Sequence, residues 1–121
     1  MSKILIIEDD KFLATLISNR LKEEGFETSI AEDGEKGLAQ AKQQKPSLII
    51  LDLLLPGMDG FEVLEKLKKE KETQSIPVII FSNLGQKEEI LKGLKLGAVD
   101  YLVKANLTPS EIINKIKLFL K

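Results

Sequence analysis

Polar side chains follow four short apolar segments of this sequence, and their types suit phosphate chemistry. Three acids, Glu8-Asp9-Asp10, follow the first segment, Asp52 follows the third, and Ser82 and Lys104 follow the last two. Crowded carboxylates without a nearby histidine or arginine repel one another, so they either raise their pKa values or recruit a cation. A hard cation that prefers oxygen ligands, Mg²⁺ above all, suits such a cluster. A metal, an ammonium and a hydroxyl around a nucleophilic carboxylate are the parts needed to hold a phosphoryl group.

Each of these residues also has a purely structural explanation. Asp9 or Asp10 is suited to cap the helix after the first segment, and Ser82 to cap the helix after the fourth. A lysine after a strand is usually solvated. Asp52 is harder to explain in this way, because it follows four consecutive aliphatic residues and burying an uncompensated carboxylate is costly. The combination at four strand ends, rather than any single residue, indicates a site.

Composition limits the chemistry that the chain can carry. Its 121 residues are 43% hydrophobic and 31% charged, which is typical of one globular domain with a real core. The absence of cysteine and histidine excludes disulfides, a thiol nucleophile and a histidine base or metal ligand. A net charge of −1 gives no reason to expect direct nucleic acid binding. No apolar run could span a bilayer and no signal peptide is visible, so we expect a cytoplasmic protein without membrane contact.

Strand-like and helical segments alternate five times along the chain, which predicts a parallel sheet covered on both faces. The expected strands are 3–7, 26–31, 48–52, 76–81 and 99–103. The expected helices are 11–24, about 35–44, one capped by Asp59, one ending at Gly97 and one starting at Thr108. In such sheets ligands bind beyond the carboxyl ends of the strands, where the polar residues fall.

Two finer expectations concern helix ends. The charged residues 68–73 are expected to form a solvated helix end and loop. The last helix combines Thr108 with Pro109 and Glu111, a capping box, and is expected to bury Ile112, Ile116 and Phe119.

Four motifs stand in order along the chain: Ile6-Ile-Glu8-Asp9-Asp10, Leu51-Asp52-Leu-Leu-Leu-Pro56-Gly57-Met-Asp59-Gly60, Phe81-Ser82, and Gly97-Ala98-Val-Asp100-Tyr101-Leu-Val-Lys104. Together they resemble the CheY-like receiver domain of bacterial two-component response regulators, from Lys3 to about Leu120. The resemblance implies a single doubly wound, flavodoxin-like α/β domain over residues 1–121, with strand order 2-1-3-4-5 and no output domain visible.

The resemblance implies that Asp52 accepts a phosphoryl group from the phosphohistidine of a sensor histidine kinase or phosphotransfer protein, with Mg²⁺. Asp9, Asp52 and the backbone carbonyl of Leu54 would bind the metal, and Glu8 would act through water. Lys104 would pair with the phosphoryl oxygens. Such a chain is not an enzyme but a phosphoacceptor that assists its own phosphorylation and dephosphorylation.

The resemblance also implies a conformational switch. Ser82 would move toward the phosphoryl group, and the Tyr101 ring would turn inward or outward with phosphorylation. The signal would leave through the face of the fourth helix, fifth strand and fifth helix, to a downstream protein or a fused output domain. That face could present Ile90, Leu94, Tyr101 and Val103, although such apolar residues are more often core.

Two positions depart from the family pattern. Receivers usually follow the lysine with a proline after a cis peptide bond, whereas Ala105 follows Lys104 here. A cis bond before a non-proline residue costs about 3 kcal/mol, so this junction is either trans or strained. Leu54 and Leu84 are apolar where a polar side chain would help to position water. We therefore expect slow loss of the phosphoryl group.

Two other functions stay open from the sequence. The first is a degenerate receiver that binds partners without phosphorylation, against which the intact set of site residues counts. The second is a phosphotransferase or phosphatase with an aspartyl intermediate, which would want a second acid at the position of Leu54. Whether the chain acts alone or belongs to a longer protein also stays open.

Overall fold

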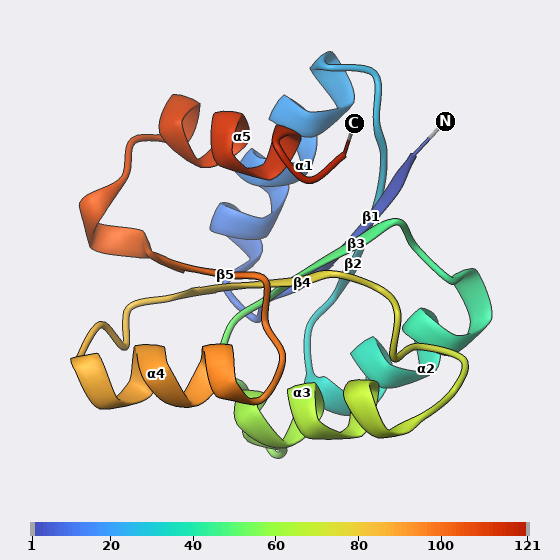
Figure 1. The fold of residues 1–121 in the computed structure, drawn as a ribbon. Coiled ribbons are helices and arrows are strands. Elements are labelled where there is room, and N and C mark those ends of the chain that lie inside the picture. The colour runs from blue at the N-terminus through green and yellow to red at the C-terminus, as the bar shows by residue number, and fades with distance from the viewer. Residues whose placement is uncertain (1, 121) are drawn as a thin grey trace.

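The computed structural model describes residues 2–120, in which a five-stranded sheet lies between two layers of helices (Figure 1). The strands are β1 (Lys3–Ile7), β2 (Glu27–Ala31), β3 (Leu48–Leu51), β4 (Val78–Ser82) and β5 (Asp100–Val103). The helices are α1 (Lys11–Glu23), α2 (Gly34–Gln44), α3 (Gly60–Lys69), α4 (Lys87–Lys95) and α5 (Pro109–Lys117), with a 3₁₀ turn η1 (Lys104–Asn106). All strand pairs are parallel, in the order β2-β1-β3-β4-β5. The predicted doubly wound α/β fold is confirmed.

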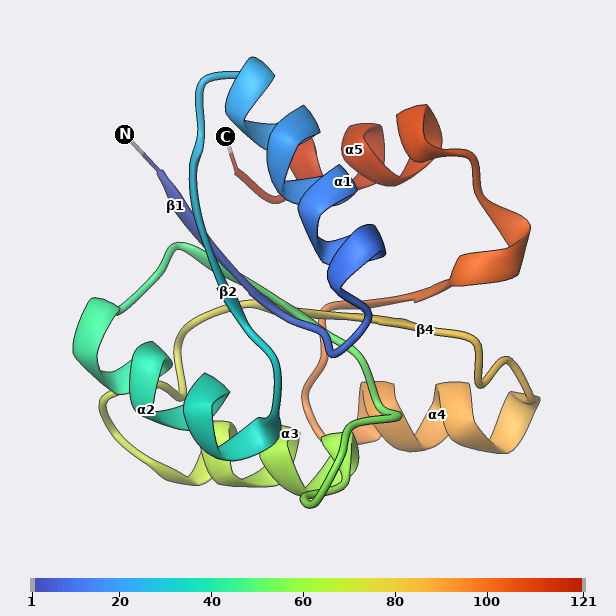
Figure 2. The ribbon, with the colours of Figure 1, turned by 180° about the vertical axis from the view of Figure 1, so that it is seen from behind.

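The two faces of the sheet bury alternate residues of each strand. Figures 1 and 2 show α1 and α5 on one face and α2, α3 and α4 on the other. Along β1, Ile4 and Ile6 join the core under α1 and α5, whereas Leu5 and Ile7 join the core under α2 and α3. All four residues of β3 are buried, as the uninterrupted apolar run predicted.

Side chains at the helix starts accept hydrogen bonds from backbone N–H groups of the first turn, which have no partner within the helix. Asp59 accepts from the Phe61 amide at 2.8 Å, and Thr108 with Glu111 forms the predicted capping box on α5. Asp10 caps α1 by accepting from the Leu13 amide. The structural explanation therefore holds for Asp10, which takes no part in the acidic cluster described below.

The structure corrects several boundaries and one burial prediction. Strand β4 begins at Val78 rather than at residue 76, because Pro77 has no N–H to give to a ladder. Phe119 is 37% exposed, because α5 ends at Lys117 and Phe119 lies beyond its last turn. Within residues 2–120, no helix is long and apolar enough to cross a membrane.

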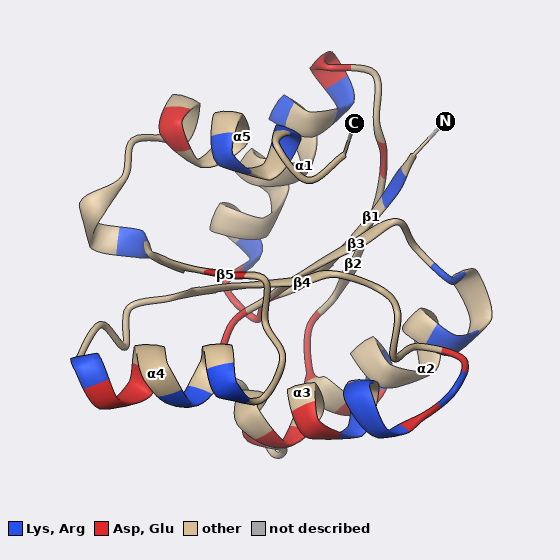
Figure 3. Cartoon of the chain, in the orientation of Figure 1, with Lys and Arg blue, Asp and Glu red and all other residues tan. Residues whose placement is uncertain are grey.

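The charged segment 68–73 forms the predicted helix end and loop, but two of its side chains are less solvated than predicted. The Lys68 ammonium donates to the carbonyls of Gln74 and Ile76, at 3.2 and 2.8 Å. Thr73 is fully buried and donates to the Leu67 carbonyl. These two side chains tie α3 to the start of β4. Charges of both signs alternate over the rest of α3 and over α4 (Figure 3).

Candidate phosphoacceptor site

Three carboxylates meet at the carboxyl ends of β1 and β3. These strands are neighbours in the sheet, and the Asp52 amide still donates to the Ile7 carbonyl at 3.0 Å, although β3 ends at Leu51. Glu8, Asp9 and Asp52 each offer one oxygen, and these oxygens lie within 4.8 Å of one another. Glu8 and Asp52 are buried and Asp9 is exposed. The cluster thus opens to solvent on the side of Asp9.

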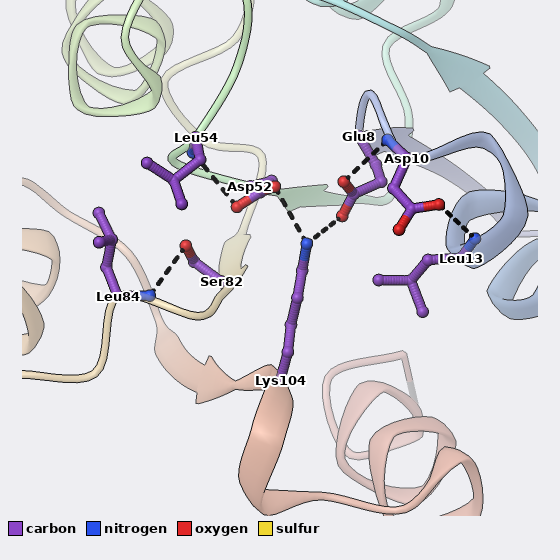
Figure 4. Close-up of polar contacts among 8 residues, drawn as sticks. All are labelled: Glu8, Asp10, Leu13, Asp52, Leu54, Ser82, Leu84 and Lys104. Carbon is purple, nitrogen blue, oxygen red and sulfur yellow. Dashed lines mark hydrogen bonds and ion pairs between the residues drawn. The ribbon is translucent and has the colours of Figure 1, made fainter.

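Lys104 supplies the positive charge of the site. Its Nζ atom lies 2.7 Å from Glu8 Oε1 and 3.0 Å from Asp52 Oδ2, and Figure 4 shows its side chain extending from the end of β5 to the gap between them. It also lies 5.5 Å from the centre of the Phe81 ring. No cis peptide bond occurs in residues 2–120, so the Lys104–Ala105 junction is trans. The departure from the family motif therefore leaves the lysine aimed at the acceptor.

The protonation equilibria at the site follow from burial and from these neighbours. Burial raises the pKa of Glu8 to about 7, although the Lys104 ammonium opposes this shift and the Asp52 carboxylate adds to it. Burial acts to lower the pKa of Lys104, but its bonds to Glu8 and Asp52 outweigh burial and leave that pKa raised. Lys104 therefore stays charged, while Glu8 readily takes up a proton.

The donor set fits a hard divalent cation. Three carboxylates against one ammonium leave a formal excess of two negative charges when all are ionised. Oxygen ligands of this kind suit Mg²⁺ or a related ion, and the exposed Asp9 leaves an approach for it. Asp9, Asp52 and Glu8 are the residues that would hold it. The role of the Leu54 carbonyl stays a prediction, since the Leu54 contact seen is its amide donating to Asp52 Oδ1 at 3.3 Å.

Ser82 and Tyr101 are joined through Leu84. Ser82 is fully buried and its Oγ accepts from the Leu84 amide at 3.3 Å. The Tyr101 hydroxyl donates to the Leu84 carbonyl. Ser82 does not cap α4, whose N-cap residue is Gln86. The ring of Tyr101 lies inward and the residue is 9% exposed, so Tyr101 belongs to the core, as such apolar residues more often do.

The other apolar side chains expected on the face of α4 and β5 are exposed to different degrees. Leu94 is 42% exposed, whereas Ile90 and Val103 are half-buried. The α4 helix buries only Gly93, against which the Tyr101 ring packs. A Cβ on Gly93 would lie 2.4 Å from Ile80 Cδ1, so glycine lets the helix approach the sheet.

Sequence reasoning did not assign roles to Gly60 and Phe81, or to the backbone of Leu84. A Cβ on Gly60 would lie 2.4 Å from the Leu53 Cα and 2.5 Å from the Asp52 carbonyl oxygen, so the start of α3 presses on the acceptor loop. The sequence signal for that close approach was the glycine that directly follows the capping residue Asp59, because glycine has no Cβ to prevent it. Nothing local in the sequence signals the contacts of Phe81 and Leu84.

Comparison with known proteins identifies the family. The model of the response regulator receiver domain matches residues 4–117. The DNA-binding dual master transcriptional regulator RpaA of Synechocystis sp. is 40% identical over all 121 residues, which cover 50% of that protein. The chain thus spans about half the length of the curated relatives it matches.

Solved structures agree with this result. The Francisella response regulator 1452 receiver domain superposes with a TM-score of 0.89 at 33% identity, covering 98% of this chain and 96% of that one. The Mn(2+)-bound form of response regulator Rcp1 superposes with a TM-score of 0.87 at 28% identity, covering 99% and 94%. The chain belongs to the response regulator receiver domain family.

Proposed function

We propose that this chain is a phosphorylation-dependent switch whose acceptor is Asp52. A carboxylate oxygen of Asp52 attacks the phosphorus of a phosphohistidine on a histidine kinase or phosphotransfer protein. The P–N bond breaks, and the imidazole nitrogen keeps the electron pair. One observation carries the proposal: Asp52 is buried at the carboxyl end of β3, yet its Oδ2 lies 3.0 Å from the Lys104 ammonium. A buried nucleophile with a cation beside it suits transfer of an anionic group.

The surrounding charges support this reaction. When the phosphoryl group arrives, the Lys104 ammonium can pair with its oxygens, because it already lies within 3.0 Å of the acceptor. Asp9, Asp52 and Glu8 would hold Mg²⁺, which when bound neutralises charge on the phosphoryl oxygens. The structural relative Rcp1 was solved in a Mn²⁺-bound form, and Mn²⁺ is an ion that also prefers oxygen ligands.

The conformational response runs through residues already in contact. The phosphoryl group would draw the Ser82 hydroxyl toward it, which disturbs the bond between Ser82 Oγ and the Leu84 amide. The Leu84 carbonyl holds the Tyr101 hydroxyl, so a shift of Leu84 alters the position of that ring. We expect α4 to follow such a shift, because Gly93 is its single buried residue and the helix is weakly anchored.

On this proposal the chain is not an enzyme acting on an external substrate. Its output goes through α4, β5 and α5 to a downstream protein or to an output domain. Support for a fused output comes from RpaA, which is named as a DNA-binding transcriptional regulator and is twice as long as the aligned region.

The test is incubation with acetyl phosphate and Mg²⁺, followed by intact mass measurement under conditions that preserve acyl phosphates. The native chain should gain the mass of one phosphoryl group, and Asp52→Asn should gain none. Asp10→Asn is the matched control, because Asp10 is an exposed acid next to Asp9 that caps α1, and asparagine caps helices equally well. No added mass on the native chain would contradict the proposal and favour a platform that works without phosphorylation.

A further inference from the structure

The turn that carries Lys104 is held weakly by its own backbone. Lys104 opens the 3₁₀ turn η1, none of whose three residues is buried. The bond that closes this turn, from the Leu107 amide to the Lys104 carbonyl, is 3.5 Å long, beyond the usual range for such bonds. The peptide between Lys104 and Ala105 is trans. The direction of the Lys104 side chain therefore depends on what its ammonium contacts.

Two of those contacts, the carboxylates of Glu8 and Asp52, change during phosphorylation. They lie 2.7 and 3.0 Å from Lys104 Nζ in the unphosphorylated chain. On the proposed function, an Asp52 oxygen becomes bonded to phosphorus, and both acids help to hold the cation. The two carboxylates then have less negative charge to offer the ammonium. A contact that does not change is needed to keep Lys104 in the same direction throughout the reaction.

The aromatic ring of Phe81 provides such a contact. Lys104 Nζ lies over this ring, 5.5 Å from its centre, which is within the range of cation–π attraction. Phe81 is 3% exposed and belongs to the core cluster under α1 and α5, where its packed neighbours fix the ring. It stands on β4 directly before Ser82 and is paired with Leu102 of β5, the strand that leads into Lys104. The core thus presents a fixed ring to the ammonium.

We propose that Phe81 is a positioning residue for phosphoryl transfer, whose ring holds the Lys104 ammonium at Asp52. The inference rests on the proposed function, in which Lys104 pairs with the phosphoryl oxygens. A neutral ring attracts a cation through its quadrupole and, unlike a carboxylate, does not repel the incoming phosphoryl group. The ring therefore keeps the ammonium in place without competing for it when the phosphoryl group arrives.

Ring fluorination tests this role with little change in the shape of the side chain. Fluorine withdraws electrons from the face of the ring, which weakens its attraction for a cation. Phe81 is replaced, through a reassigned stop codon, by phenylalanine that carries one, two or three ring fluorines. The rate of phosphorylation by acetyl phosphate with Mg²⁺ is followed by intact mass. Each added fluorine should lower this rate, by roughly five-fold in total, which is the effect of one partly desolvated cation–π contact.

Two comparisons separate positioning from packing. Phe26 packs against the same core cluster but directly precedes β2, at the amino edge of the sheet, so its fluorination should leave the phosphorylation rate unchanged. Lys104→Met removes the cation and leaves the Phe81 ring. Fluorination of Phe81 should lower the folding equilibrium constant of the native chain by roughly five-fold more than that of Lys104→Met, as chemical denaturation would show.

Several outcomes overturn the inference. Equal phosphorylation rates across the fluorine series do so while leaving Asp52 as the acceptor. An equal fall in rate when Phe26 is fluorinated assigns the effect to core packing. Equal effects of Phe81 fluorination on the folding of the native chain and of Lys104→Met exclude the ammonium as the partner of the ring. No phosphorylation of the native chain overturns both this inference and the proposed function.

Discussion

The Lys104 ammonium lies 3.0 Å from Asp52 Oδ2, although the two residues are 52 positions apart in the sequence. The same nitrogen lies 2.7 Å from Glu8 Oε1. One ammonium thus serves two buried carboxylates, and the exposed Asp9 adds a third acid nearby. The site carries excess negative charge, and its stability should therefore respond to pH and to divalent cations.

The stability of the metal-free protein should fall as pH rises from about 5 to about 7. Folding raises the pKa of Glu8 from 4.5 to about 7, so the folded state binds this proton more tightly than the unfolded state. The cost to the free energy of unfolding from burying the ionised Glu8 carboxylate is absent below pH 4.5 and grows between the two pKa values. It is complete above pH 7, at roughly 3 kcal/mol. Glu8→Gln should remove it, as chemical denaturation at pH 5 and pH 8 would show.

Glu32 gives a control with the opposite sign. Its hydrogen bond and ion pair with Lys36 lower its pKa at the surface. In the native chain this pair adds a small stabilisation above pH 4.5, which disappears as the pH falls below that value. Glu32→Gln should therefore be slightly less stable than the native chain only above pH 4.5. Equal pH profiles for Glu8→Gln and the native chain would contradict the assignment to Glu8.

Mg²⁺ should raise the free energy of unfolding of the native chain, because it binds the folded carboxylate cluster in preference to the unfolded chain. At one hundred times the dissociation constant the gain is about 2.7 kcal/mol, which thermal unfolding at increasing Mg²⁺ would measure. Asp9→Asn should lose most of this gain, whereas Asp10→Asn should keep it. A similar gain in both variants would place the ion elsewhere.

Phosphorylated Asp52 should lose its phosphoryl group slowly. Leu54 and Leu84 present apolar side chains beside the acceptor, where a polar group could position water. Leu54→Asn combined with Leu84→Glu should speed the decay by roughly ten-fold or more, a modest part of the effect of a positioned base. The decay is followed by intact mass after removal of the donor, with Leu91→Asn as the exposed-leucine control. An unchanged decay rate would rule out shielding by the two leucines.

Tyr101→Phe should release the loop between β4 and α4. The change removes the hydroxyl that donates to the Leu84 carbonyl and leaves the ring in place. The expected loss is about 1 kcal/mol of unfolding free energy, with faster amide hydrogen exchange at Asn83 to Gln86. Exchange rates equal to those of the native chain would show that this bond does not hold the loop.

The inward ring of Tyr101 can be checked by titration, because the chain has a single tyrosine. Burial, with smaller contributions from Glu89 and Asp52, raises the pKa of Tyr101 to about 12. The tyrosinate absorbance should therefore appear near pH 12 in the folded protein and near pH 10 in the unfolded chain. A midpoint near 10 in the folded protein would indicate an outward ring.

The sheet and the residues at its carboxyl edge could be predicted from the sequence. The run Leu48–Leu51 had to be a strand buried on both faces, and Asp59 and Thr108 indicated the starts of α3 and α5. Parallel strands end at one edge of the sheet, so polar residues after β1 and β3 had to meet there. These features follow from local periodicity and from one topological rule.

Which of those residues touch depends on the tertiary structure. The trans junction after Lys104, the inward Tyr101 ring and its bond to the Leu84 carbonyl depend on contacts between distant segments. The same holds for the exposure of Phe119, which no helical spacing could indicate once α5 had ended. Local patterns carry no information on these contacts, because side-chain rotamers and loop paths are selected by the packing of elements that the chain brings together only on folding.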